Sequence, residues 1–323
     1  MRVAIIGAGA WGTTVAIHLA QKGHDILLWS RDPDRAHRMQ LSRENDRYLK
    51  SFRLPDGVRV VSSLGEGADF LIGAVPTQPM RTVFARLRDS LPRAPFLSLA
   101  KGIEIGTGLL PTQVYADVAG GDRPRAVLTG PCIAGEVARG LPTAVVVAGD
   151  EAQAFQGLFN TSRFRVYTSD DPTGAELVGA LKNVMGIAAG IVDGMGLGDN
   201  AKAALLTRSI VEITRLGLAL GAKAQTFTGL AGFGDLFTTC VSPHGRNRGL
   251  GERIGRGERL DEILASTSSI AEGVPTTRAV LALARERGVE MPITSAIHAI
   301  LFEGVAVERA LGTLMSRDRR AER

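Results

Sequence analysis

The chain has 323 residues, of which 45% are apolar and 22% charged, and its formal net charge is +5. This length accommodates two domains with separate cores, and the composition is that of an ordinary globular protein. Basic residues are spread along the chain, aromatic residues make up only 5%, and no nucleic-acid-binding motif occurs. The charge fits small phosphorylated ligands at least as well as nucleic acid, and we expect no nucleic-acid partner.

The first half of the chain alternates short apolar runs with helical patterns. Near-continuous apolar strands that alternate with helices predict a mainly parallel sheet covered on both faces, so the predicted fold class is α/β, a doubly wound Rossmann domain. The predicted strands cover residues 2–7, 25–29, 58–61, 69–75, 95–100, 125–130, 143–149 and 163–167.

After residue 174 only helical spacing is found. The predicted helices cover residues 175–194, 200–221, 275–288 and 295–304. No flexible linker or internal repeat separates the two halves. We therefore predict a dinucleotide-binding domain over residues 1–177 and an all-α substrate and catalytic domain over residues 178–323.

The start of the chain resembles a signal peptide, but Gly7, Gly9 and Gly12 interrupt its apolar run, and β/α alternation follows. No uncharged apolar stretch reaches the roughly 18 residues of a membrane span. Cys132 and Cys240 lie far apart and belong to no Cys/His cluster, which excludes a disulfide scaffold and a structural zinc site. We expect a cytoplasmic protein without a metal and without membrane insertion.

The same three glycines form a GxGxxG pattern between the first strand and the first helix. Gly7 and Gly9 allow a tight turn and the close approach of a pyrophosphate, and Gly12 allows close packing of helix on strand. The free N–H groups at the start of the helix would then face the phosphates. This position makes the pattern predictive of a dinucleotide site.

The end of the second strand bears on the choice of cofactor. Sites that select NAD have an acid about 20 residues after the glycines, but here Arg31 comes first and Asp32 follows it. An arginine can accept the 2′-phosphate of NADP, although a solvated charge pair would give the same sequence. We expect NADP as cofactor, with NAD left open.

Each half also contains a lysine among apolar residues. Lys101 follows an apolar strand at the carboxyl edge of the sheet, where such sheets bind ligands, although an exposed loop lysine would look similar. Lys182, with Asn183 beside it, lies in a glycine-rich apolar helix, eleven residues before Asp193 and on the same helical face. Burial of an unpaired ammonium is costly, so Lys182 needs a partner or a function.

The other polar residues of the second half lie in glycine-marked turns. Asp235 stands in "GLAGFGDLFTTC", and Arg246, Asn247 and Arg248 stand in "SPHGRNRG". Singly, Asp235 is explained as the N-cap of a helix and the basic triplet as a solvated turn. Together with Lys182 and a dinucleotide domain, they indicate a site for a phosphorylated carbonyl compound.

These motifs make the chain similar to the bacterial-type NAD(P)-dependent sn-glycerol-3-phosphate dehydrogenases. The resemblance runs almost end to end and includes "GAGAWGTTVA", "AKGIE", "GPCIAGEVARGLPTA", "GALKNVMGIAAGIVDG", "GLAGFGDLFTTC" and "GRNRGLG". It implies a Rossmann domain followed by an α-helical domain. It also implies interconversion of dihydroxyacetone phosphate and sn-glycerol 3-phosphate by hydride transfer with NADP or NAD. The glycerol 3-phosphate would be used in phospholipid synthesis.

The resemblance further implies roles for individual residues, with Lys182 as the general acid/base. The residues implied to bind the substrate are Lys101, Gly130, Cys132, Lys182, Asp235, Gly245, Arg246 and Asn247. Those implied to bind the cofactor are Gly7, Gly9, Ala10, Trp11, Gly12, Arg31, Lys101, Ala134, Arg246, Ile270 and Glu272. Where the family usually has a hydroxyl residue, this chain has Ala10, Cys132 and Gly245, which offer no side-chain hydroxyl. Backbone contacts are expected from Gly130, Cys132 and Gly245.

The implied chemistry gives the buried lysine a purpose. Reduction of the ketone needs a hydride at C2 and a proton for the developing alkoxide. Apolar surroundings can lower the pKa of a lysine toward neutrality, which suits an acid/base, and Asp235 would moderate that effect. Asn183 would orient the ammonium or the substrate, and Arg246 would bind the phosphate.

Two alternatives stay open. A β-hydroxyacid-type dehydrogenase of the 6-phosphogluconate or ketopantoate group shares both domain types, but its helix lysine usually has its asparagine a turn later, whereas Lys182 and Asn183 are adjacent. A non-catalytic NAD(P) sensor would have little use for Lys182, Asp235 and Arg246 together. The ratio of cofactor use, the oligomeric state (a homodimer included), feedback regulation and the direction of flux are left open.

Overall fold

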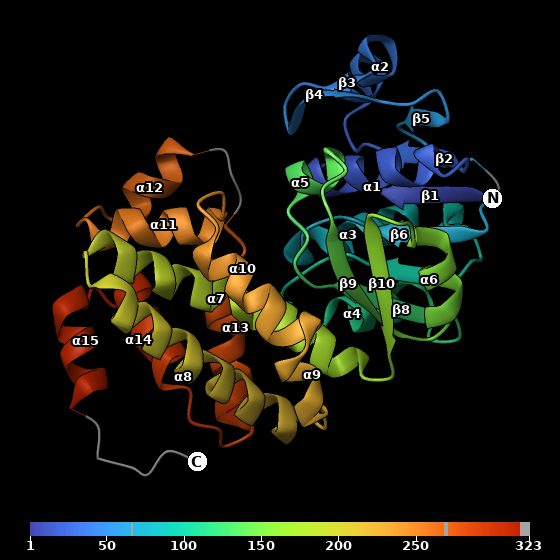
Figure 1. Cartoon of the computed structure of the whole chain (residues 1–323). Helices are drawn as coiled ribbons and strands as arrows, with labels where there is room; N and C mark the ends of the chain where they lie inside the picture. The colour runs from blue at the N-terminus through green and yellow to red at the C-terminus, as the bar shows by residue number, and fades with distance from the viewer. Residues whose placement is uncertain (66, 268–270, 317–323) are drawn as a thin grey trace. The chain divides into compact units, whose positions relative to one another are not determined.

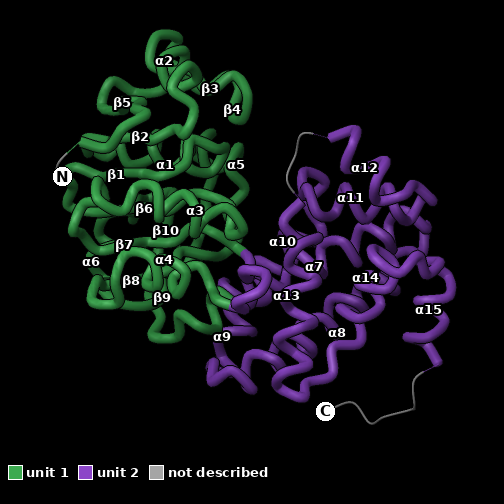
Figure 2. Tube along the Cα trace, turned by 180° about the vertical axis from the view of Figure 1, so that it is seen from behind, with its two compact units in different colours: residues 1–101, 109–176 green, residues 102–108, 177–323 purple. Residues whose placement is uncertain are grey.

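The computed structural model describes residues 1–65, 67–267 and 271–316 (Figure 1). It divides into two compact units, which we call unit 1 (residues 1–101 and 109–176) and unit 2 (residues 102–108 and 177–323) (Figure 2). Local sequence patterns offered no reason to separate residues 102–108 from the first domain. In the structure, this short segment has its contacts with the helices of unit 2.

Unit 1 is built on an eight-stranded sheet with the order β10-β9-β8-β7-β6-β1-β2-β5. Every neighbouring pair is parallel except β8 and β9. The predicted apolar runs form these eight strands, and the predicted α/β fold class is confirmed. Their bounds are β1 (Arg2–Ile6), β2 (Asp25–Trp29), β5 (Val58–Val61), β6 (Phe70–Gly73), β7 (Phe96–Ser98), β8 (Arg125–Thr129), β9 (Thr143–Gly149) and β10 (Phe164–Ser169).

The two faces of this sheet carry separate hydrophobic clusters. In β1, Val3 and Ile5 belong to one cluster, and Ala4 and Ile6 belong to the other. Helices cover both faces, so β1 is buried and apolar at every position after Arg2, whereas β5 and β10 keep exposed positions. One cluster includes residues of α1 (Ala10–Gln21), α2 (Pro33–Ser42), α5 (Ala134–Ala138) and α6 (Ala152–Phe159), and the other includes residues of α3 (Thr77–Leu87) and α4 (Pro111–Ala119).

The strand order reverses beside β1. The chain runs outward from β1 through β2 to β5 and then returns to β6 on the other side of β1. The carboxyl ends of β1 and β6 therefore form the switch point at which open α/β sheets bind ligands. Unit 1 also contains elements that the sequence patterns did not predict, namely a short antiparallel hairpin, β3 (Glu44–Asn45) and β4 (Leu49–Arg53), and a one-turn helix, η1 (Arg88–Ser90).

Within the described residues, unit 2 contains helices and no strand. The four predicted helices correspond to α7, α8, α13 and α14. An 18-residue window of α7 is apolar enough to span a membrane, but 94% of it is buried inside the protein, so α7 is a core helix. The elements are α7 (Pro172–Gly194), α8 (Gly198–Ala219), α9 (Ala224–Thr228), the π-helical turn η2 (Leu230–Gly234), α10 (Asp235–Val241), α11 (Arg246–Gly255), α12 (Leu260–Ser266), α13 (Gly273–Glu286), α14 (Pro292–Phe302) and α15 (Val307–Met315).

Candidate active site

The glycine fingerprint connects β1 to α1 at the switch point. Gly7 has a φ of +119°, which favours glycine. A Cβ on Gly12 would lie 3.2 Å from the carbonyl carbon of Gly7 and still nearer its oxygen, so close packing excludes a side chain there. A Cβ on Gly9, by contrast, would meet no atom within 4 Å. The fold itself does not need a glycine at residue 9, and the open space beside it fits a bound group.

The first turn of α1 offers unused donors to such a group. The first i→i−4 hydrogen bond runs from Thr13 N to Gly9 O at 2.9 Å, so the N–H groups of Ala10, Trp11 and Gly12 precede it. The Trp11 Nε1 atom is buried without a hydrogen-bond partner among the described residues. A helix N-terminus with open space in front of it is a suitable site for a pyrophosphate.

Two residues that sequence analysis missed hold this glycine loop in place. Arg35 Nη2 donates to the carbonyl oxygen of Ala8, and Asn45 Nδ2 donates to the same oxygen at 3.1 Å and to Thr13 Oγ1 at 2.7 Å. The Arg35 guanidinium also lies over the ring of Tyr48, 4.5 Å from its centroid. Asn45 belongs to the hairpin, which has no periodic signal in the sequence. Arg35 could have been considered, because it follows Arg31 by only four residues.

The end of β2, which bears on cofactor choice, is followed by an arginine without an ion-pair partner among the described residues and by an aspartate that caps a helix. Arg31 is exposed and has no ion-pair partner among the described residues. Asp32 is the N-cap of α2, and its Oδ1 accepts a hydrogen bond from Arg35 N at 3.1 Å. The carboxylate that an NAD site would use is therefore engaged in capping a helix.

Three predicted substrate residues lie together at the carboxyl edge of β7 and β8. Lys101 Nζ lies 3.4 Å from the carbonyl oxygen of Gly130 and 3.8 Å from Cys132 Sγ. Lys101 is half-buried rather than an exposed loop lysine. The nearby Ala134 begins α5, and its carbonyl accepts a hydrogen bond from Thr14 Oγ1 of α1 at 3.2 Å. This contact places Ala134 beside the helix that carries the glycine fingerprint.

In unit 2, Lys182 of α7 forms a hydrogen-bonded ion pair with Asp235, the first residue of α10. The two residues are 7% and 1% exposed, so both charges are buried. Asp235 is not the N-cap of its helix, because Gly234, at the end of the π-helical turn η2, takes that position. The ion pair supplies the compensation that a buried ammonium requires.

The basic triplet forms the first turn of α11 and not a solvated turn. Arg246 is exposed, whereas Asn247 is buried. Asn247 Nδ2 donates to Asn183 Oδ1 at 3.0 Å, and Asn247 Oδ1 accepts from Gly273 N at 3.0 Å. Gly245 is the N-cap of α11. The side-chain amide of Asn247 thus links the start of α11 to α7 and α13.

The start of α11 has the same features as the start of α1. Its first i→i−4 hydrogen bond runs from Gly249 N to Gly245 O at 2.8 Å, so three backbone N–H groups precede this bond. Those N–H groups belong to residues 246–248, and the first of these residues, Arg246, also carries an exposed guanidinium. Positive charge together with free N–H groups suits a phosphate.

Comparison with known proteins decides the family. Models of the NAD-dependent glycerol-3-phosphate dehydrogenase N-terminus and C-terminus match residues 2–155 and 171–312. A glycerol-3-phosphate dehydrogenase [NAD(P)+] of Chlorobium luteolum is 48% identical over 100% of both chains. The chain belongs to the NAD-dependent glycerol-3-phosphate dehydrogenase family. This confirms the resemblance seen in the sequence motifs.

Solved structures agree with this family. The crystal structure of a glycerol-3-phosphate dehydrogenase from Coxiella burnetii has a TM-score of 0.93 and 38% identity, over 98% of this chain and 99% of that one. A ketopantoate reductase from Ralstonia eutropha has a TM-score of 0.61 and only 16% identity, over 96% of this chain and 100% of that one. The second likeness shows a shared fold alone.

The remaining site residues expected for a glycerol-3-phosphate dehydrogenase lie in unit 2 or outside the described part of the chain. Glu272 is the half-buried N-cap of α13, and its carbonyl accepts a hydrogen bond from Thr276 Oγ1 at 2.6 Å. Ile270 lies outside the described residues. Arg246 and Glu272 belong to unit 2, whereas the other described cofactor residues belong to unit 1.

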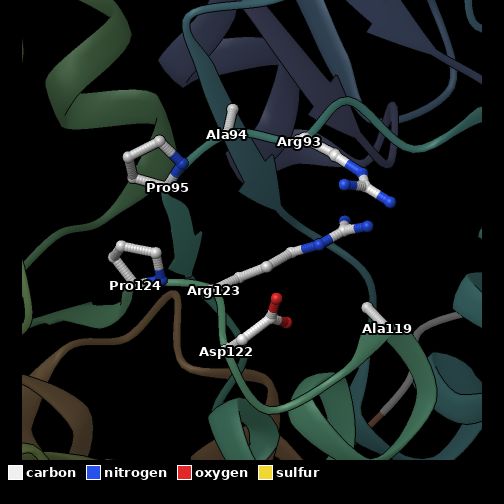
Figure 3. A pocket seen from close by; sticks show the side chains of 7 residues that line it. All are labelled: Arg93, Ala94, Pro95, Ala119, Asp122, Arg123 and Pro124. Atoms are coloured by element: carbon white, nitrogen blue, oxygen red, sulfur yellow. The ribbon is translucent and has the colours of Figure 1, made fainter.

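In unit 1, a hollow of about 240 Å³ lies beside the segments that precede β7 and β8 (Figure 3). Pro95 and Pro124 line it and directly precede β7 and β8, so the hollow lies at the amino edge of the sheet. Lys101 and Gly130 follow the same two strands at the opposite, carboxyl edge. None of the described residues that the family resemblance assigns to substrate or cofactor lines this hollow, whose lining residues are Arg93, Ala94, Pro95, Ala119, Asp122, Arg123 and Pro124.

Proposed function

We propose that this member of the glycerol-3-phosphate dehydrogenase family interconverts dihydroxyacetone phosphate and sn-glycerol 3-phosphate with NADP(H) or NAD(H). The observation that carries the proposal is the buried ion pair of Lys182 and Asp235. Such a pair adds little to stability because desolvation offsets its attraction, but it holds a proton donor in a fixed place. The name of the full-length Chlorobium relative supports the same reaction.

In this proposal the glycine loop of unit 1 binds the dinucleotide. The N–H groups of the first turn of α1 would hold the pyrophosphate, which the open space at Gly9 admits. Arg31 would accept the 2′-phosphate of NADP, and the capping role of Asp32 favours NADP over NAD. Bound NAD(P)H supplies the hydride for C2 of the ketone.

Lys182 is the proposed general acid for reduction. Its ammonium is held by the Asp235 carboxylate, which favours the charged form and fixes the direction of Nζ. As the hydride reaches C2, Lys182 gives its proton to the developing alkoxide. In the oxidation direction the neutral amine takes the proton from the C2 hydroxyl. Asp235 stabilises the lysine in its charged form in both directions.

The start of α11 is the proposed site for the substrate phosphate. Three backbone N–H groups and the Arg246 guanidinium supply charge-assisted donors there. The Asn247 amide is occupied by Asn183 and Gly273, so its proposed contribution is a backbone N–H and the placement of the helix. In unit 1, Lys101 with Gly130 and Cys132 supplies the other proposed substrate contacts.

The test is the oxidation of NADPH with dihydroxyacetone phosphate, with 2-ketopantoate, or with neither. We expect turnover with dihydroxyacetone phosphate alone, and sn-glycerol 3-phosphate as the product. Turnover with 2-ketopantoate alone would assign the chain to the ketopantoate group. Cofactor binding without turnover of either compound would indicate an NAD(P) sensor. In a cytoplasmic setting, an enzyme with this activity would supply sn-glycerol 3-phosphate for phospholipid synthesis. That the chain forms a homodimer stays a prediction.

A further inference from the structure

Within unit 2, α7 and α11 touch through glycines on both helices. A Cβ on Gly190 would lie 2.7 Å from Glu252 N, and a Cβ on Gly255 would lie 2.5 Å from the carbonyl oxygen of Ile191. The two backbones are therefore in direct contact. The glycines of this seam are Gly186, Gly190 and Gly194 on α7, and Gly251 and Gly255 on α11.

A seam of this kind fixes the separation of two helices better than it fixes their register. Helices normally resist sliding because the side chains of one fit between those of the other. Glycines remove those side chains, so polar contacts at the edges of the seam must hold the register. The hydrogen bond from Asn247 of α11 to Asn183 of α7 is one such contact.

The second contact is an ion pair between α11 and α7. Arg248 Nη2 lies 2.6 Å from Asp193 Oδ2, and the two side chains are only 15% and 17% exposed. Asp193 Oδ2 makes no aligned hydrogen bond with a described residue, so the contact is electrostatic. The other Asp193 oxygen pairs with Lys202 of α8, and Arg248 Nη1 lies 3.4 Å from Glu252 Oε2 within α11. Asp193 thus joins α7 to both α11 and α8.

We propose that Asp193 and Arg248 are positioning residues for the phosphate of the substrate. Arg248 belongs to the same helical turn as Arg246, so the ion pair holds the start of α11 in register with Lys182 of α7. The inference rests on the proposed function, because it assumes that the start of α11 binds a phosphate. Removal of one partner leaves the other charge poorly compensated, and the register of α11 on α7 then depends on the Asn247–Asn183 hydrogen bond alone.

The experiment compares Asp193→Asn with the wild-type enzyme on two substrates. We expect the KM for dihydroxyacetone phosphate to rise about tenfold, because contacts of the phosphate are made in both ground and transition states. We expect kcat and the KM for NADPH to stay within about twofold. Dihydroxyacetone lacks the phosphate, so its kcat/KM should not change. General structural damage would lower activity on both substrates alike.

Three further variants serve as references for the change in KM of Asp193→Asn. Arg246→Ala gives the size of the effect when a phosphate contact is lost outright. Asp193→Glu keeps the charge and should show a smaller rise in KM than Asp193→Asn. Arg253→Gln is the matched control, because it breaks an ion pair between α11 and Glu258, which follows the helix, and the two side chains are 34% and 39% exposed. Arg253→Gln should leave the KM for dihydroxyacetone phosphate unchanged.

An unchanged KM for dihydroxyacetone phosphate in Asp193→Asn would overturn the inference, and so would an equal loss on dihydroxyacetone. If Asp193→Asn is insoluble, Asp193→Glu and Arg248→Lys take its place in the same comparison. Insolubility of all three variants would assign the pair to folding and would also overturn the inference. A wild-type enzyme without activity on dihydroxyacetone phosphate would overturn the proposed function itself, and the inference with it.

Discussion

Lys182 and Asp235 bring two charges into the interior of unit 2, and at 7% and 1% exposure neither is solvated by bulk water. The cost of desolvating two charges is of the same order as their attraction, so the pair does little for the free energy of unfolding. Apolar residues would fill the same space at no such cost. We propose that the function of the pair is to hold the proton for the reaction.

Replacement of the lysine tests this role. We expect Lys182→Ala to lower kcat by at least about 100-fold, because a general acid is lost, while the Kd for NADPH stays nearly unchanged. Steady-state kinetics and a fluorescence titration with NADPH give the two quantities. Activity within a few-fold of wild type would remove Lys182 from the mechanism.

Arg31 offers a second test at the scale of one residue. Because its exposed guanidinium is the proposed partner of the 2′-phosphate, Arg31→Ala should weaken NADPH more than NADH, by about 1–2 kcal/mol. The KM values for both cofactors measure the difference. Arg38→Ala removes another exposed arginine, on α2, and should change neither value. Equal losses for NADH and NADPH in Arg31→Ala would show that Arg31 does not read the 2′-phosphate.

At the scale of elements, α11 shows that identical residues can have opposite roles within one turn. A Cβ on Gly249 would meet no atom within 4 Å, whereas a Cβ on Gly251 would lie 2.8 Å from the carbonyl carbon of Ile187 and closer to its oxygen. Gly249 only adds backbone freedom to the helix. Gly251 is required by the contact with α7.

This contrast predicts opposite changes in stability. Gly249→Ala should raise the free energy of unfolding by about 0.5–1 kcal/mol, because alanine costs less backbone entropy in a helix. Gly251→Ala should lower it by about 1–3 kcal/mol or more, because the new methyl group must push two backbones apart. Urea unfolding followed by circular dichroism measures both. Similar changes in the two variants would argue against a backbone contact at Gly251.

At the scale of the whole molecule, two buried glutamates hold helix N-termini from a distance. Glu176 accepts hydrogen bonds from Thr112 N at 2.9 Å and Thr112 Oγ1 at 2.6 Å, at the start of α4. Glu212 accepts from Ile293 N at 2.7 Å and Thr294 N at 2.9 Å, at the start of α14. Burial raises the pKa of Glu176 to about 7 and also raises the pKa of Glu212.

Stability should therefore depend on pH in a defined direction. A carboxyl with a higher pKa in the folded chain keeps its proton there after the unfolded chain has lost it. For Glu176 the folded chain binds more protons between pH 4.5 and about 7. The free energy of unfolding should fall by about 3 kcal/mol as pH rises through this window and stay level above it.

The free energy of unfolding is measured with urea for wild type and Glu176→Gln at several values from about pH 5 to about pH 8, and the difference between the two proteins is compared across this range. The difference is used because burial lowers the pKa of His18, which gives the opposite slope below pH 6.5 in both proteins. Glu286→Gln, at an exposed position on α13, should follow the wild-type profile. Parallel profiles for wild type and Glu176→Gln would contradict the role of Glu176.

The sequence by itself determined the eight strands, the long helices and the glycine turn, because period and turn chemistry are properties of neighbouring residues. It also carried the family resemblance. The family models and the full-length relatives confirm that resemblance, and the roles of Lys182, Arg246 and the other site residues stay predictions. The β3–β4 hairpin escaped detection because its strands are short and its polar and exposed residues follow no period.

Only the tertiary structure decided which polar groups meet. Asp235 reads as a helix cap, yet it pairs with a lysine 53 residues earlier in the chain. Asn247 and Arg248 look like a solvated turn, yet they join α11 to Asn183 and Asp193 of α7. These partners are brought together by the packing of elements that are distant in sequence. A local pattern records which side of an element is buried but not which group lies opposite it.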